Sequence, residues 1–197
     1  MAIAKTRNML IDVARQLFAK LGVENTTMND IAAASKKGRR TLYTYFNNKN
    51  EVYQAVVESE LEKMYVELQA VAEKDLPADE KLLSYIHTRL DAVKNVVFRN
   101  GTLKADFFRD IWRVQNVRKA FDRKEIQTLK EILQTGVDEG SLEMPDVDMT
   151  AEILHHALKG IEVPYIRGLI RADNTRSNRQ HVNIAFLIFQ GIKKKKR

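Results

Sequence analysis

The sequence contains no cysteine, and its 197 residues include only three prolines and eight glycines. The absence of cysteine excludes disulfide bonds, thiol nucleophiles and cysteine-ligated zinc. Scarce proline and glycine leave few helix breakers, while abundant Leu, Lys, Glu, Ala and Gln favour helices. We therefore expect an all-α protein, since no segment shows the alternating pattern of a β-strand.

Long apolar runs are also missing. The longest uninterrupted run, Ile184 to Phe189, is far too short to cross a bilayer. Near the N-terminus, Lys5, Arg7 and Asp12 interrupt the apolar stretch that a signal peptide requires. The sequence thus predicts no membrane association and a cytoplasmic location.

Positive charge is concentrated at the two ends of the chain. Of a net charge of +7, residues 1–50 contribute +6 and residues 193–197 contribute +5, whereas residues 51–192 carry −4. A basic segment of this size suits a polyanion such as DNA, and the acidic remainder argues against a surface that wraps nucleic acid throughout. The tail is typical of a solvated chain end.

The first fifty residues predict three helices and a turn. A first helix with apolar residues at helical spacing stops at Gly22. Thr27 precedes Asp30 by three residues, as in a capping box that opens a short second helix. After a turn over residues 35–38, a third helix spans residues 39–46. This order is typical of a helix-turn-helix, which binds the major groove of double-stranded DNA.

The third predicted helix carries side chains that suit base recognition. Arg39 and Arg40 match the acceptors of guanine, although the pair also fits a solvated helix face. Tyr43 either contacts DNA or packs half-buried against the first helix. Thr27 and Lys49 lie at helix N-termini, where free N–H groups favour phosphate. The expected DNA contacts are Thr27, Lys37, Arg39, Arg40, Thr41, Tyr43, Tyr45 and Lys49.

Three segments together resemble the DNA-binding domain of the tetracycline-repressor (TetR) family: Ala14–Gly22 (ARQLFAKLG), Thr26–Ala32 (TTMNDIA) and Thr41–Lys49 (TLYTYFNNK). The resemblance covers roughly residues 5–60. It implies a homodimeric, all-helical regulator with an N-terminal DNA-binding domain and a C-terminal domain for ligand binding and dimerisation. We accordingly expect a helix-turn-helix domain at 1–48, an effector-binding and dimerisation domain at 49–192, and a basic tail at 193–197.

The turn departs from the family pattern. Ser35-Lys36-Lys37-Gly38 replaces the usual Ala-Gly-Val-Ser. Lys36 in the place of glycine implies a positive φ at a cost of about 1 kcal/mol, unless Gly38 shifts the turn. Lys37 removes an apolar side chain from beneath the turn, and Arg40 replaces a small residue. This turn therefore affects the angle at which the third helix docks on DNA and which side chains contact bases.

The remainder of the chain predicts further helices. A long helix follows Asn48, a second runs from Pro77 to the Asn100-Gly101 break, and a third closes at Gly140. Between the last two, residues 103–112 predict a short aromatic-rich helix. The last two helices are expected at 148–172, with a kink at Pro164, and at 176–192.

In a TetR-like protein the middle helices would enclose a pocket for a small-molecule effector. His87 lies on an apolar stripe, as either a buried hydrogen-bonded histidine or a polar point in a cavity. The aromatic side chains of the middle helices are either plain core or part of a ligand box. The residues expected to line this pocket are His87, Phe107, Phe108, Trp112 and Tyr165.

The last predicted helix is apolar almost all round, which requires cover on two sides. We expect a second copy of the chain to cover one side in a two-fold interface that includes Leu158, Phe186 and Phe189. A two-fold dimer requires a roughly palindromic operator.

Glu152 is followed by His155 and His156 at positions that ligate iron when a second Glu-x-x-His exists. None does, so the pair is interpreted as interface or surface histidines, and we predict no metal and no cofactor. The sequence likewise shows no nucleophile–base arrangement and no glycine-rich phosphate loop, so an enzyme is not expected.

The leading hypothesis is a dimeric repressor that a small molecule releases from its operator. The basic turn and tail leave one alternative, an architectural DNA-binding protein without a sensing role, with little sequence preference and a steep salt dependence.

Overall fold

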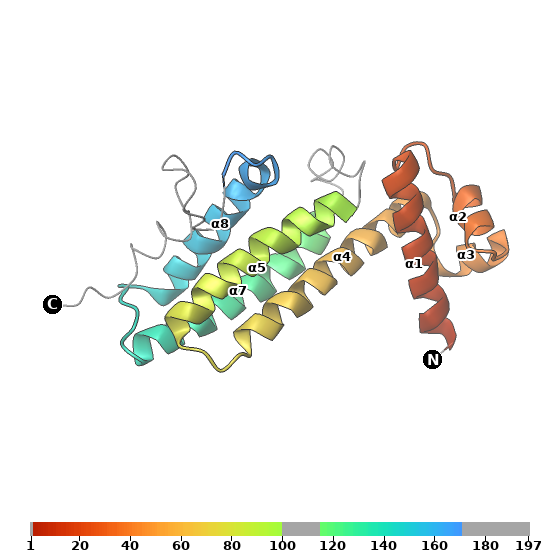
Figure 1. Ribbon diagram of the computed structural model, residues 1–197. Helices are drawn as coiled ribbons and strands as arrows, with labels where there is room; N and C mark the ends of the chain where they lie inside the picture. Colours follow the sequence, from red (N-terminus) through yellow and green to blue (C-terminus); the bar gives the residue numbers. More distant parts are fainter. Residues whose placement is uncertain (1, 100–114, 171–197) are drawn as a thin grey trace. The chain divides into compact units, whose positions relative to one another are not determined.

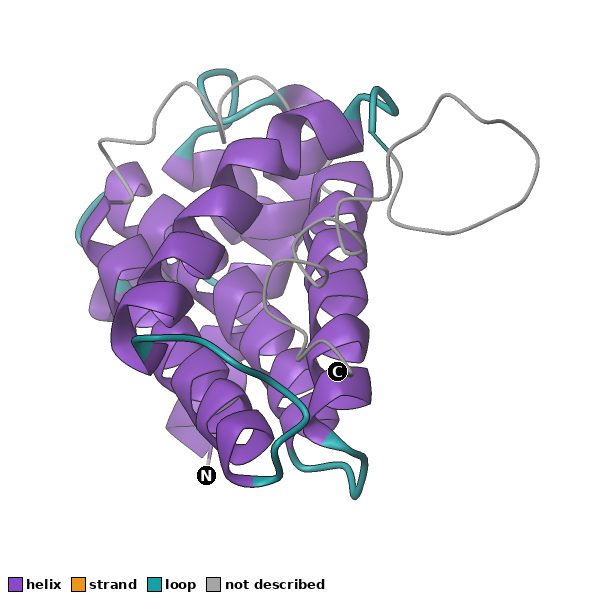
Figure 2. Cartoon of the chain, turned by 90° about the vertical axis from the view of Figure 1, so that its left-hand side faces the viewer, coloured by secondary structure: helices purple, strands orange, loops and turns teal. Residues whose placement is uncertain are grey.

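The computed structural model describes residues 2–99 and 115–170, and within them the chain is helical with no β-strand (Figure 2). The all-α prediction is therefore confirmed. The described helices are α1 (Ala2–Leu21), α2 (Met28–Ala34), α3 (Arg39–Tyr45), α4 (Lys49–Ala72), α5 (Ala78–Arg99), α7 (Gln115–Asp138) and α8 (Val147–Ile166) (Figure 1).

The chain forms two compact units. In its described part, the first contains residues 2–63, 96–99 and 115–119, and the second contains residues 64–95 and 120–170. Each unit has its own apolar core, as expected when helices bury one face.

The core of the first unit forms where α1, α2 and α3 meet. Leu10, Ala14 and Phe18 recur along one face of α1 and are fully buried, as are Ile31 of α2 and Leu42 of α3. Because these apolar residues hold α2 and α3 from beneath, the outer face of α3 remains exposed.

The ends of α1 and α4 follow local sequence signals. Gly22 ends α1 with a φ of +86°, the left-handed conformation that glycine adopts without strain. At the start of α4, the Asn48 side chain accepts a hydrogen bond from the backbone N–H of Glu51 at 3.0 Å. The helix then runs without a break to Ala72.

The second unit packs α5, α7 and α8 alongside one another (Figure 1). Buried residues recur at helical spacing on each helix, for example Ile86 and Leu90 of α5, Leu129 and Leu133 of α7, and Leu158 of α8. Thus the periodicity that predicted helices also identifies the faces that pack.

Helix α8 is shorter than the sequence predicted. It was expected to continue to about residue 172 with a kink at Pro164, but it ends at Ile166. Gly168 follows with a φ of +72° and stops the helix in the left-handed conformation. The predicted helices at 103–112 and 176–192 and the tail at 193–197 lie outside the described residues.

Among the described helices, none combines the length and the apolar character needed to cross a membrane.

Candidate functional site

The N-terminus of α2 is fixed by the capping box that the sequence predicted. The Thr27 hydroxyl accepts a hydrogen bond from the Asp30 N–H at 3.2 Å, and the Thr27 N–H donates to the Asp30 carboxylate at 2.8 Å. The Thr27 hydroxyl also donates to this carboxylate at 2.7 Å. These hydrogen bonds from Thr27 stabilise the ionised carboxylate and lower the pKa of Asp30.

The turn between α2 and α3 contains the strained residue that its sequence predicted. Lys36 has a φ of +54°, and within the described ranges no other residue except glycine has a positive φ. Gly38 then provides the extended N-cap of α3, with φ −64° and ψ 149°. Lys37, between them, is exposed. The turn therefore presents a basic side chain immediately before α3.

Helix α3 has a buried face and an exposed face. Leu42 is fully buried and Phe46, at its C-cap, is 3% exposed. The opposite face exposes Arg39, Arg40 and Tyr43, and the Arg39 guanidinium lies 5.9 Å from the centre of the Tyr43 ring. Thr41 and Tyr45 are half-buried at its edges, and Thr44 is exposed. This exposed face offers guanidinium, phenol and hydroxyl groups side by side.

Lys49 makes contacts within the protein that its sequence context does not indicate. Its ammonium group donates hydrogen bonds to two backbone carbonyls after α1, those of Val23 at 2.8 Å and Glu24 at 3.1 Å. The side chain is half-buried and ties the first residue of α4 to the loop after α1. Its phosphate contact stays a prediction, and the structure gives Lys49 a local structural role as well.

The residues between α3 and α4 hold a second carboxylate in place. Glu51 accepts hydrogen bonds from the backbone N–H of Asn47 at 2.8 Å and from the Asn47 side chain at 3.0 Å. These bonds, the backbone one foremost, lower the pKa of Glu51. Asp30 and Glu51 are therefore ionised at neutral pH, and each fixes a helix N-terminus.

The N-terminal residues match a known family. The model of "Bacterial regulatory proteins, tetR family" matches residues 10–56. The HTH-type transcriptional regulator TtgR of Pseudomonas putida is 42% identical over 55 residues, which are 28% of this chain and 26% of that protein. The "Probable acrEF/envCD operon repressor" of Escherichia coli K12 is 26% identical over 168 residues, covering 80% of this chain and 74% of the relative. Residues 10–56 are therefore similar to the DNA-binding domain of the tetR family.

Solved structures extend the similarity, at the level of the fold, to nearly the whole chain. A transcriptional regulator from Cytophaga hutchinsonii has a TM-score of 0.74 and 22% identity, and the alignment covers 95% of this chain and 98% of that one. SmeT in complex with triclosan has a TM-score of 0.68 and 18% identity, with 97% and 93% coverage. The arrangement of helices is thus that of TetR-type regulators.

Only part of the predicted effector pocket lies among the described residues. His87 is half-buried on α5. Tyr165 of α8 is 8% exposed and donates a hydrogen bond from its hydroxyl to Asp91 at 2.6 Å. Phe107, Phe108 and Trp112 lie outside the described residues, as do Phe186 and Phe189 of the predicted dimer interface. Leu158, the third residue predicted at that interface, is fully buried within its own chain.

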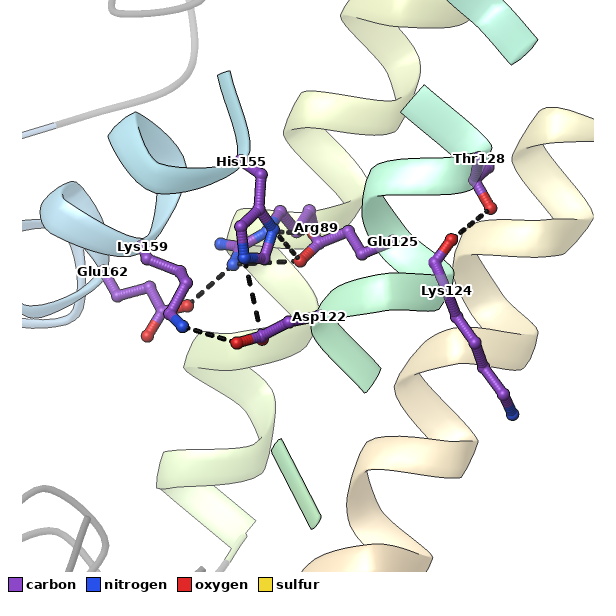
Figure 3. A network of polar contacts seen from close by, with 8 residues as sticks. All are labelled: Arg89, Asp122, Lys124, Glu125, Thr128, His155, Lys159 and Glu162. Carbon is purple, nitrogen blue, oxygen red and sulfur yellow. Dashed lines mark hydrogen bonds and ion pairs between the residues drawn. The ribbon is translucent and has the colours of Figure 1, made fainter. Parts of the chain in front are cut away.

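The second unit contains six charged or titratable side chains that meet between three helices (Figure 3). Arg89 of α5 donates hydrogen bonds to Glu125 of α7 and, at 2.8 Å, to Glu162 of α8. Arg89 and Glu125 are almost completely buried. We call the whole set the buried ion cluster; its members are Arg89, Asp122, Glu125, His155, Lys159 and Glu162.

His155 of α8 lies between two carboxylates of α7. Its Nδ1 is 2.8 Å from Glu125 and its Nε2 is 3.7 Å from Asp122, although neither contact is an aligned hydrogen bond. Lys159 contacts Asp122 at 2.7 Å. Burial raises the pKa of Asp122, but its contacts with His155 and Lys159 outweigh burial and lower this pKa to about 2.

Asp122, Glu125 and His155 are also the one group in the described part of the chain close enough to hold a metal ion, with ligand atoms within 4.8 Å of one another. Both carboxylates already face a cation, Arg89 or Lys159. The two ring nitrogens of His155 face different carboxylates, whereas one ion would need both oxygens on the side of a single nitrogen. The cluster is therefore better suited to hold a proton than a metal.

The sequence presents His155 only as half of a histidine pair, and it does not predict the buried ion cluster. One signal was available at Arg89, which follows Leu82, Tyr85 and Ile86 on the buried side of α5. A charged residue on an apolar stripe requires a buried partner. The sequence does not reveal which acidic residue of another helix supplies that partner.

Proposed function

We propose that this protein is a transcriptional repressor that binds a palindromic operator as a dimer and leaves it when a small molecule binds the helical domain. The observation that carries this proposal is the exposed face of α3, where Arg39, Arg40 and Tyr43 project from a helix anchored by Leu42 and Phe46. Buried anchors beneath an exposed basic face are what a recognition helix requires.

The chemistry of this face suits sequence-specific recognition of DNA. Arg39 and Arg40 each offer a planar pair of donors for the O6 and N7 acceptors of guanine. Tyr43 and the half-buried Thr41 and Tyr45 suit thymine methyl groups or phosphates. Lys37 and the N-terminus of α2 at Thr27 would hold phosphates on either side.

An apolar face of α8 supports the dimer. Met149 and Ile153, one turn apart, are 55% and 62% exposed. Ala157 and Gly160 continue this exposed face with small residues, and none of the described residues has an atom within 4 Å of the site that a Gly160 side chain would occupy. Burial of such a stripe against the same helix of a second chain would remove it from water and impose two-fold symmetry.

Release from the operator by a small molecule is supported by a protein of similar fold. SmeT, which shares this fold, has been solved with triclosan bound. The half-buried His87 and buried Tyr165 would contribute polar groups to a corresponding pocket in this chain.

The proposal is tested by mobility-shift titrations on the DNA upstream of the protein's own gene. Arg39→Ala and Tyr43→Ala are expected to weaken specific binding, the arginine substitution by about 1–3 kcal/mol because two hydrogen bonds to one base are lost. Lys74→Ala is the matched control, since Lys74 is an exposed lysine of the loop after α4.

Equal retention of specific binding by Arg39→Ala and Tyr43→Ala would refute the assignment of α3 as the recognition helix. A footprint confined to one palindrome supports the repressor. Uniform protection of unrelated DNA with a steep salt dependence would favour the architectural alternative.

A further inference from the structure

The buried ion cluster has no part in DNA recognition as proposed above, and it is costly to maintain. Charged groups taken out of water lose several kcal/mol of hydration, which only close partners restore. His155 is fully buried within the cluster, and both its ring nitrogens face carboxylate oxygens (Figure 3).

This placement between two carboxylates favours the protonated state of His155. A neutral imidazole carries one N–H, so its other nitrogen would turn a lone pair toward an anion. Glu125 and Asp122 are ionised, because Arg89 and Lys159 pair with them. Only the doubly protonated ring presents an N–H to each carboxylate.

The charges of the cluster balance only in that state. Arg89, Lys159 and protonated His155 supply three positive charges, and Asp122, Glu125 and Glu162 supply three negative ones. Loss of the proton leaves a net negative charge beside the buried Glu125 and Glu162, where screening by water is weak.

The groups that face His155 come from all three helices. From α5, Arg89 reaches Glu125 and Glu162, and the buried Tyr85 lies one turn before Arg89. From α7 come Asp122 and Glu125. On α8 itself, the His156 ring lies 5.2 Å from the His155 ring, and Lys159 and Glu162 lie one and two turns further along.

We propose that protonated His155 is a pH-sensitive clamp that ties α8 to α7, so that alkaline pH loosens α8 from the other helices of the second unit. Burial by itself lowers the pKa of His155, but the contacts with Asp122 and Glu125 outweigh burial and raise it above the ordinary value of 6.5. Stabilisation from a raised histidine pKa is complete below 6.5 and is lost as the pH rises through the raised value.

The direct test is an NMR titration of the histidine ring protons in the full chain. The chain has four histidines, so single substitutions of His87, His155, His156 and His181 by glutamine assign each resonance. We expect the His155 resonance to titrate above pH 6.5. We further expect Glu125→Gln to lower its midpoint, because one of the two anions is removed. A midpoint at or below 6.5, or no shift in Glu125→Gln, would overturn the proposal.

Thermal unfolding across the same pH range tests the consequence for the fold. The wild-type midpoint should fall by several degrees above pH 6.5 relative to His155→Gln, whose cluster has no such proton to lose. His156→Gln, which alters the exposed neighbouring ring, should follow the wild type. The proposal also fails if Zn²⁺ raises the wild-type midpoint but not that of His155→Gln, because an ion would then occupy the cluster.

Discussion

Lys36 shows how a single residue can set the conformation of the candidate interface. It adopts a φ of +54° in the turn before α3, a conformation that costs a non-glycine residue about 1 kcal/mol. With Lys36 in this conformation, the side chains of Lys36 and Lys37 are exposed immediately before the proposed recognition helix. The turn therefore gains positive charge at the expense of stability.

Lys36→Gly is expected to stabilise the protein by up to about 1 kcal/mol, because glycine adopts a positive φ without strain. Urea unfolding measures the change. Lys37→Gly removes the same charge one position later, where φ is not positive, and should destabilise the protein slightly. Equal effects of the two substitutions would show that charge, and not backbone strain, governs the stability of the turn.

The same scale shows what sequence predicts about single residues. The Thr27–Asp30 capping box follows from signals within four residues, whereas the positive φ of Lys36 follows from the resemblance to a turn that usually has glycine there. Both predictions are confirmed. The contact of Lys49 with the carbonyls of Val23 and Glu24 joins groups some 25 residues apart, so no local pattern indicates it.

At the scale of helices, Arg89 links α5 to both α7 and α8 through Glu125 and Glu162. Arg89→Leu leaves both carboxylates without that partner and is expected to cost about 3–5 kcal/mol, measured by urea unfolding. Arg123→Leu is the matched control, because Arg123 is an exposed arginine of α7 and its loss should change stability by about 0.5 kcal/mol or less. A similar loss in both variants would indicate that the buried pairing has no special weight.

Helices are the level at which the sequence predicted most. The longer helices α1, α5 and α8 have an apolar period near 3.6 residues, and signals such as Gly22 and Thr27 mark where helices stop or start. These features depend only on neighbouring residues. The sequence predicts the end of α8 too far along the chain, because Pro164 indicates a kink within a longer helix, whereas Gly168 stops the helix. The pairing of Arg89 with Glu125 and Glu162 depends on how helices pack, which helical periodicity does not specify.

At the scale of the whole molecule, the uneven charge has a measurable effect on DNA binding. The +6 of residues 1–50 predicts that phosphate contacts come from this segment. Lys37→Ala should reduce the slope of log affinity against log salt by about 1 and weaken binding to specific and unrelated DNA alike. Arg39→Ala should instead mainly reduce the preference for the operator.

Measuring Lys37→Ala, Arg39→Ala and the control Lys74→Ala on operator and scrambled DNA at several salt concentrations separates these roles. An unchanged slope in Lys37→Ala would remove Lys37 from the predicted phosphate contacts. A lower slope in Lys74→Ala would show that residues outside the basic N-terminal segment also contact DNA.

The balance of three positive and three negative charges in the buried ion cluster also constrains how this chain can evolve. Replacing one of the buried members, such as Arg89, removes a partner from buried charges, so single steps of this kind pass through a destabilised intermediate. We therefore expect substitutions at the cluster positions to occur together among descendants of this gene, so that an ion pair is replaced by a pair of apolar residues. The exposed residues of α3 can be substituted one at a time, because none of them pairs with a buried charge. The preferred operator sequence can therefore change while the interior stays the same.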